Sequence, residues 1–270
     1  MTKILLLLIL SLITAIPAVA VKEDIPHDLP EPLQPLVTAP NCVEYFPTLQ
    51  GYVHDDPTIL LKTADARFQV FINNYVGTLY KRERLEGEWP PLSVIKFLFR
   101  KEPYSVYMEW LKGADRADKL HYVEGKWDNK MLAHPTGLLS WIDSVKRDPQ
   151  GKAARQASLN TVDEFGFGRV FDRTLKIIEK ARKENELTLK YLGIEEVNGL
   201  RCLAFERILP PTGKYRFPRA IMKFAITDLM PREIILYDNE YRLEGHYIYR
   251  DLKFNVGLNE TDFLAETHDL

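Results

Sequence analysis

The sequence predicts an α+β protein: a curved antiparallel sheet, or half-open β-barrel, of about ten strands that is covered by two or more amphipathic helices. Two segments carry apolar residues at helical spacing, and short alternating segments with Gly or Pro at their joints follow each of them. Such short joints favour antiparallel neighbours. The central strands carry apolar residues on both faces, so we expect helices to cover one of these faces.

The first twenty residues have the features of a secretory signal peptide. Lys3 gives a positive start, an apolar stretch too short to span a bilayer follows, and Ala18-Val19-Ala20 is a small-x-small cleavage site. No cysteine directly follows that site, and no later apolar run approaches the roughly 20 residues of a membrane helix. We therefore expect residues 1–20 to be removed, leaving a soluble periplasmic or secreted protein that is not an integral membrane protein.

Residues 21–55 are rich in proline. Their prolines include Pro26, Pro30, Pro32, Pro35 and Pro40. Proline removes backbone donors and favours extended backbone, so we predict an N-terminal arm laid on the surface. Residues 56–270 are predicted to form a single domain, since their length fits one large α+β domain.

Two segments of this domain are predicted to be helices. Asp56-Pro57 is typical of a helix start, in which an N-cap precedes a proline. The apolar positions that follow it at helical spacing are Leu60, Ala64, Phe68, Phe71 and Tyr75. Those of the second helix are Phe167, Val170, Phe171, Leu175, Ile178 and Ala181. Each set forms one apolar stripe that should face the sheet.

The remaining pattern has the period of strands. The predicted strands are residues 78–85, 92–101, 105–111, 119–124, 130–134, 187–194, 200–209, 219–227, 232–238 and 241–252. Val197-Asn198-Gly199 predicts a hairpin turn between two of them. Among the strand residues, Lys81, Arg82 and Arg84 are interpreted as edge or outer-face charges.

The sequence carries no self-sufficient catalytic, cofactor or metal signature. A formal net charge of −2 argues against nucleic acid as a partner. The six histidines include no pair at the spacing that places two ligands on one helix or strand face. Ser140 and Ser158 lie in no Gly-x-Ser-x-Gly elbow. The sequence therefore indicates no particular reaction, and we expect no metal and no cofactor.

The chain has two cysteines, Cys42 and Cys202. In an oxidising compartment this even number permits one disulfide, which would tie the arm to the second half of the chain. Two unpaired thiols, with Cys202 a small buried strand residue, are the alternative that the residues leave open.

Four stretches together resemble an uncharacterised bacterial envelope family, a domain of unknown function. They are residues 76–84 (VGTLYKRER), 103–110 (PYSVYMEW), 122–125 (YVEG) and 249–258 (YRDLKFNVGL). The resemblance covers most of residues 59–263. That family is similar in architecture to the periplasmic carriers of the lipoprotein-localisation pathway (LolA-like), whose half-open barrel, plugged by helices, holds acyl chains in a hydrophobic cavity. The resemblance implies this fold, but fold alone does not transmit function.

A curved sheet with two-sided apolar strands could form a cavity for a lipid, an acyl chain or the anchor of a lipoprotein. The predicted lining consists of Phe97, Phe99, Met108, Trp110, Met222, Phe224 and Ile226. An ordinary dry core is the alternative interpretation of each residue. Two other functions stay open: an envelope enzyme whose polar groups converge only in space, and a structural protein that binds another envelope protein along a sheet edge.

Overall fold

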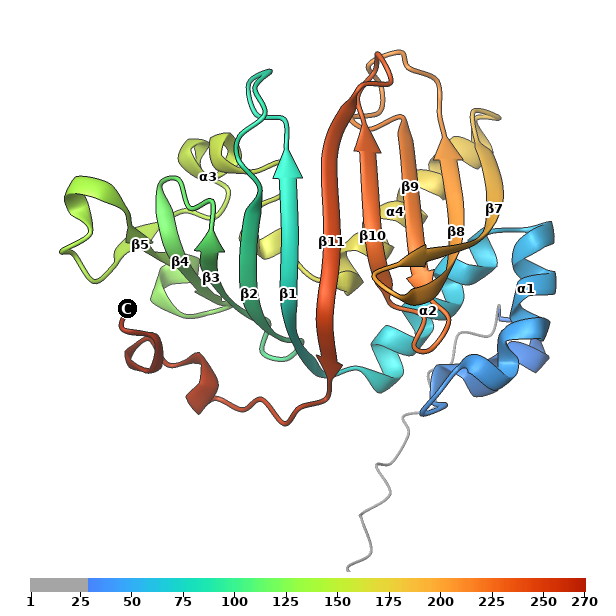
Figure 1. Cartoon of the computed structure of the whole chain (residues 1–270), viewed down its shortest axis with the longest axis horizontal. Coiled ribbons are helices and arrows are strands. Elements are labelled where there is room, and N and C mark those ends of the chain that lie inside the picture. The colour runs from blue at the N-terminus through green and yellow to red at the C-terminus, as the bar shows by residue number, and fades with distance from the viewer. Residues whose placement is uncertain (1–28) are drawn as a thin grey trace, which may run out of the picture.

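The computed structural model describes residues 29–270, so the expected signal peptide lies outside the described residues. One curved antiparallel sheet of eleven strands forms its framework, in the order β6-β5-β4-β3-β2-β1-β11-β10-β9-β8-β7 (Figure 1). The strands are β1 Asn74–Glu83, β2 Ser93–Arg100, β3 Ser105–Lys112, β4 Ala117–Val123, β5 Met131–Pro135, β6 Val145–Arg147, β7 Thr188–Val197, β8 Leu200–Ile208, β9 Arg219–Ala225, β10 Pro231–Tyr237 and β11 Leu243–Phe254. The predicted α+β class is confirmed, and β6 is a strand that the sequence pattern did not indicate.

The pairing of β1 with β11 joins two meanders into this sheet. β1 to β6 follow one another as antiparallel neighbours, and β7 to β11 do the same. β1 and β11 pair from Tyr75 opposite Phe254 to Glu83 opposite Gly245. The predicted hairpin between β7 and β8 is present, with Asn198 at a φ of 50° as this type of turn requires.

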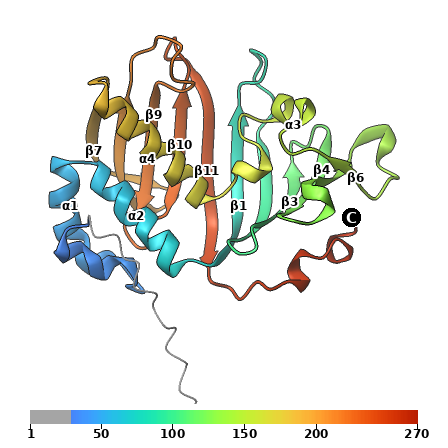
Figure 2. The ribbon, with the colours of Figure 1, turned by 180° about the vertical axis from the view of Figure 1, so that it is seen from behind.

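Two long helices cover one half of one face of the sheet. α2 Thr58–Phe71 and α4 Phe167–Lys183 lie across β7 to β11, whereas only the short helix α3 Lys152–Ala157 and the adjoining chain lie over β1 to β4 in the same view (Figure 2). Under α4 the rings of Phe171 and Phe224 stack, with 6.2 Å between their centroids. This half of the interface between sheet and helices is a close-packed core.

Both predicted helices are confirmed, but the first one ends earlier than predicted. Asp56 accepts a hydrogen bond from the backbone N–H of Thr58 at 2.9 Å, which supports the start of α2. The helix ends at Phe71, and Tyr75 lies in β1 instead. There the ring of Tyr75 stacks on Phe167, with 4.9 Å between the centroids, and its hydroxyl accepts the Phe167 N–H. Tyr75 therefore fixes the start of α4 against the sheet.

The described part of the proline-rich segment, residues 29–55, is not the extended surface arm that its composition predicts. Glu31–Val37 forms a 3-10 helix and Phe46–Asp55 forms helix α1. The buried side chains of this segment include Leu33, Leu36, Val37, Leu49 and Val53. Arg67 of α2 also donates to the carbonyl oxygen of Leu36 at 2.8 Å. Proline is compatible with the first turn of a helix, so the apolar residues between the prolines determine how this segment packs.

The C-terminal segment covers part of the opposite face of the sheet. Phe263 is buried against Tyr107 and Val123, and the ring of His268 stacks on Tyr107 with 3.6 Å between centroids. His121 is fully buried beside them, and neither of its ring nitrogens has a hydrogen-bond partner among the described residues. This cover explains why β3 carries apolar side chains on both faces.

Candidate functional site

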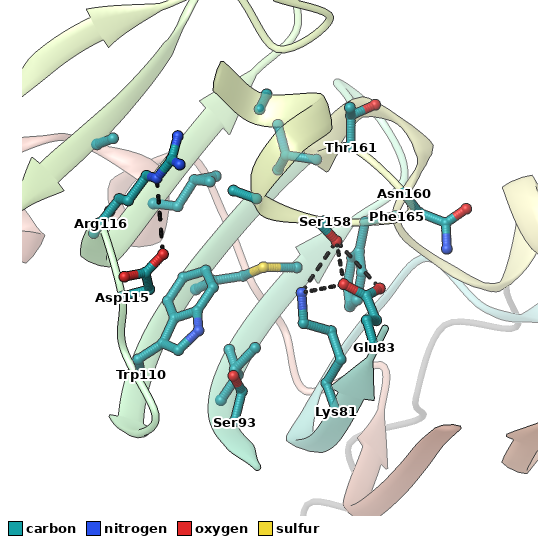
Figure 3. A pocket seen from close by; sticks show the side chains of 18 of the residues that line it. Lys81, Glu83, Ser93, Trp110, Asp115, Arg116, Ser158, Asn160, Thr161 and Phe165 are labelled. Atoms are coloured by element: carbon teal, nitrogen blue, oxygen red, sulfur yellow. Dashed lines mark hydrogen bonds and ion pairs between the residues drawn. The ribbon is translucent and has the colours of Figure 1, made fainter. Parts of the chain in front are cut away.

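A cavity of about 690 Å³ lies between the helix-covered face of the first meander and the chain that connects β6 to α4 (Figure 3). Apolar side chains of five strands make up its floor: Leu79, Ile95, Met108, Trp110, Leu120, Met131 and Ala133. Its roof includes Ala153, Ala154, Ala157, Val162 and Phe165. The volume lies within the range of about 300–1,000 Å³ that is usual for small-molecule sites.

The cavity exists because the cover over this half of the sheet is thin. α3 has six residues and none of them is buried. Its cavity-facing residues are alanines, whose side chains are too small to fill the space below. The chain that connects β6 to α4, here called the roof chain, returns to the sheet at Gly166. This residue has a φ of 96°, and a Cβ at this position would lie only 2.5 Å from the Phe99 ring, so glycine is required here.

A polar cluster, here called the Glu83 clasp, holds one end of the roof to the floor (Figure 3). The Glu83 carboxylate accepts hydrogen bonds from the Ser158 hydroxyl at 2.9 Å and the Tyr247 hydroxyl at 2.7 Å. It also accepts the backbone N–H of Leu159 at 3.2 Å and forms an ion pair with Lys81 at 3.1 Å. Glu83 is only 2% exposed, so these contacts satisfy a buried charge.

The clasp places the roof chain at a fixed distance from β1. Ser158 directly follows the last residue of α3, so its bond to Glu83 holds that end of the helix. Burial, and then the negative charge of Glu83, raise the pKa of Tyr247 well above its usual value. The Tyr247 hydroxyl therefore keeps its proton and remains a donor to the carboxylate.

The structure divides the residues that were predicted to line a cavity. Met108 and Trp110 of β3 line it. The other five, Phe97, Phe99, Met222, Phe224 and Ile226, lie in the main hydrophobic core. The physical reason is what packs on them: Phe165 contacts Phe97 and Phe99, and Phe171 of α4 stacks on Phe224.

The interpretation of Lys81 as an outer-face or edge charge is wrong. Lys81 and Glu83 lie on the same side of β1 as Leu79, so both point into the cavity. Arg82 and Arg84 do lie on the outer face, where each guanidinium sits 5.2 Å from the centre of the Trp89 ring. Because side chains alternate between the faces of a strand, the sequence of β1 alone could have placed Lys81 on the face opposite Arg82 and Arg84.

Both cysteines carry free thiols in the structure. Cys42 packs in the main core, whereas Cys202 packs with Val197 and Ala225 in a separate cluster. Burial raises the pKa of each thiol to about 11, which disfavours the reactive thiolate. This arrangement corresponds to the unpaired alternative, and a disulfide in the exported chain stays a prediction.

No group of three or more His, Cys, Asp or Glu side chains suited to a metal ion occurs within residues 29–270. In the same part of the chain, no helix is both long and apolar enough to cross a membrane. The candidate site is therefore described by its cavity and by the polar groups at its end.

The chain is similar in fold to several solved structures at low sequence identity. A DUF1329 family protein from Desulfovibrio piger is 12% identical over 80% of this chain and 98% of its own, with a TM-score of 0.40. A LolA superfamily protein from Nitrosomonas europaea is 10% identical over 78% and 98%, with a TM-score of 0.34. In the MucA/MucB complex from Pseudomonas aeruginosa the identity is 13% over 78% of this chain, with a TM-score of 0.41. This chain covers 60% of that matched chain, less than two thirds.

No curated protein matches the sequence. A family model does match, over residues 72–269, which include all eleven strands, α3, α4 and most of the C-terminal segment. The expected membership of an uncharacterised domain family is confirmed: the chain belongs to the DUF1571 family of proteins of unknown function.

Proposed function

We propose that this protein is an exported binding protein that holds an acyl chain of a lipid or lipoprotein in the cavity below α3. The observation that carries the proposal is the hollow of about 690 Å³ with its apolar floor. Each methylene group that leaves water for such a surface contributes about 0.8 kcal/mol to binding. An apolar chain is therefore the ligand that gains most from this space.

Access to the cavity supports the same proposal. Leu138 and Trp141 are 96% and 78% exposed, and they lie beside Leu139, which lines the cavity. Large apolar side chains exposed together are unusual on a soluble protein and commonly mark a binding surface. An acyl chain that enters here would contact apolar side chains from the rim inward.

The enzyme alternative has less support in this geometry. Lys81 Nζ lies 3.1 Å from Ser158 Oγ, which resembles the spacing of a nucleophile and its base. However, Lys81 is in an ion pair with Glu83, and Glu83 already accepts several hydrogen bonds. Neither group is free to remove the Ser158 proton, so the cluster is better explained as a structural clasp.

The partner-binding alternative would use an open sheet edge. β7 is one such edge, and it carries Lys190, Glu195 and Glu196 together with a shift of register between Tyr191 and Gly193. Edge charges and bulges discourage the addition of another strand. The edge therefore provides no specific support for this function.

A chain-length series tests the proposed function. The affinity for primary alcohols of increasing length, measured by calorimetry, should rise about fourfold for each added methylene, which is 0.8 kcal/mol. The rise should stop when the chain fills the cavity. In parallel, native mass spectrometry of protein purified from its own envelope should detect a bound lipid. Absence of alcohol binding, with the fold intact, would refute the proposal.

A cavity-filling variant localises the binding. Ala154 lies on the cavity side of α3, so Ala154→Trp should occupy the space and abolish alcohol binding. Lys152→Trp adds the same side chain to an exposed position of the same helix that does not line the cavity, and it should bind like the wild type. Equal binding by the two variants would place any bound alcohol elsewhere.

A further inference from the structure

Arg173 lies at the polar end of the cavity and has no partner among residues 29–270. Gly166, Val170 and Arg173 follow one another at helical spacing, and all three line the cavity, so this flank of α4 faces the space. Arg173 is half-buried, yet no hydrogen bond or ion pair reaches its guanidinium within residues 29–270. A guanidinium is always charged in proteins, so a half-buried one without an acceptor is unfavourable.

The other charged groups that line the cavity leave Arg173 without a counterion. Glu83 is engaged in the clasp, and Glu164 accepts the backbone N–H of Thr161 at 3.0 Å. Asp115 lies 3.8 Å from Arg116. The described acidic groups of the cavity are thus committed elsewhere.

A second buried arginine, Arg207, lies within electrostatic range of Arg173. Arg207 of β8 is 4% exposed, and its Nη2 donates to the carbonyl oxygen of Phe217, but its Nε is buried without a hydrogen-bond partner among the described residues. Burial, and then the positive charge of Arg173, lower the pKa of Arg207 to about 10. Two guanidinium groups within electrostatic range of each other repel, and a bound anion would stabilise both.

Arg207 and Glu83 lie on the same face of the sheet. Cross-strand pairing places Arg207, Ala220, Leu236, Gly245 and Glu83 in one row on the helix-covered face. α4 passes over this part of the sheet (Figure 2). Burial raises the pKa of both Tyr247 and Tyr249, and the positive charge of Arg173 partly opposes this increase, so Arg173 lies within electrostatic range of both hydroxyls.

We propose that Arg173 binds the anionic head, a carboxylate or a phosphate monoester, of an amphiphile whose acyl chain lies on the apolar floor of the cavity. This inference rests on the proposed function and names the class of lipid. Arg207, which lies within electrostatic range of Arg173, adds to the positive potential at the head. The ligand then extends from α4 towards Trp110 and the rim at Leu139.

The test compares a fatty acid with the primary alcohol of the same chain length. Arg173→Gln should weaken fatty-acid binding by about 10- to 100-fold, as expected for the loss of a charged hydrogen bond, and should leave alcohol binding unchanged. Arg173→Lys keeps the positive charge and should retain most of the fatty-acid affinity. Lys183→Gln removes one exposed charge from the same helix and should change neither affinity. Thermal unfolding of each variant confirms that it is folded.

Several outcomes would overturn the inference. Equal losses for acid and alcohol in Arg173→Gln would mean that Arg173 only supports the packing, and no loss for the acid would place the head elsewhere. Competition by inorganic phosphate as effective as that of the fatty acid would indicate a simple anion site. If the wild type binds the alcohol and Arg173 makes no difference, this inference alone fails. If the wild type binds neither ligand, the proposed function fails with it.

Discussion

Replacement of Glu83 by glutamine should destabilise the protein more than the removal of any one of its donors. The carboxylate is 2% exposed, accepts hydrogen bonds from Ser158, Tyr247 and the Leu159 N–H, and forms an ion pair with Lys81. Loss of one partner of a buried ion pair typically costs about 3–5 kcal/mol, and we expect Glu83→Gln to fall in that range. Ser158→Ala removes one donor and leaves the others, so its expected cost is about 1–2 kcal/mol.

Urea unfolding followed by circular dichroism at neutral pH measures these differences. Glu196→Gln neutralises an exposed carboxylate on the edge strand β7, and as a matched control it should change stability by less than about 0.5 kcal/mol. The double variant Lys81→Met with Glu83→Gln removes both charges, so it should recover part of the loss. A Glu83→Gln variant as stable as Ser158→Ala would refute the clasp as the contact that holds the roof.

Three further predictions concern the core, the C-terminal segment and the cysteines. Phe97→Ala should lower the free energy of unfolding by about 3–5 kcal/mol, measured with urea. Trp110 faces an existing cavity, so Trp110→Ala should lower it less and should weaken lipid binding more. The reverse order would contradict the placement of the cavity. Burial lowers the pKa of His121 to about 3 from 6.5, so the unfolded chain binds a proton that the folded chain does not, and stability should fall as pH drops through this window. His121→Phe should flatten this acid limb in unfolding measurements, and an unchanged pH dependence would contradict the assignment. In a copy expressed in the cytoplasm, Cys42 and Cys202 should both react with maleimide after unfolding without reductant and should resist it in the native state. The exported protein should show no labelling after unfolding without reductant, because the predicted disulfide occupies both thiols, and two reactive thiols in that preparation would contradict the disulfide.

The spacing of apolar residues and the turn residues between strands were sufficient to predict the sheet, because both are local properties of the sequence. Asn198-Gly199 predicted the β7–β8 hairpin, and the stripe from Phe167 to Ala181 predicted α4. β6 has only three residues, too few for an alternating pattern to be recognised. The segment before α2 was predicted to be extended because local proline preferences do not report the burial of Leu36 in a distant core.

The cavity could not be derived in the same way, because it depends on what lies above the sheet. Phe97 and Met108 are paired across β2 and β3 on the same face, yet only Met108 reaches the hollow. The ring of Phe165 from the roof chain packs on Phe97, with 5.2 Å between centroids. The path of that roof chain, and not the strand pattern, therefore decides which apolar residues are dry core and which are lining.

The two halves of the sheet differ in how completely they are covered. Over β7 to β11, α2 and α4 carry large apolar side chains that fill the interface, as the stack of Phe171 on Phe224 shows. Over β1 to β6, the cover is α3, whose inward residues are alanines and whose end is held by the Glu83 clasp. Each large side chain placed on α3 would add packing free energy and remove binding volume. Ala154→Trp should therefore raise the unfolding temperature while it abolishes ligand binding, and a lower unfolding temperature would contradict the presence of free space below α3.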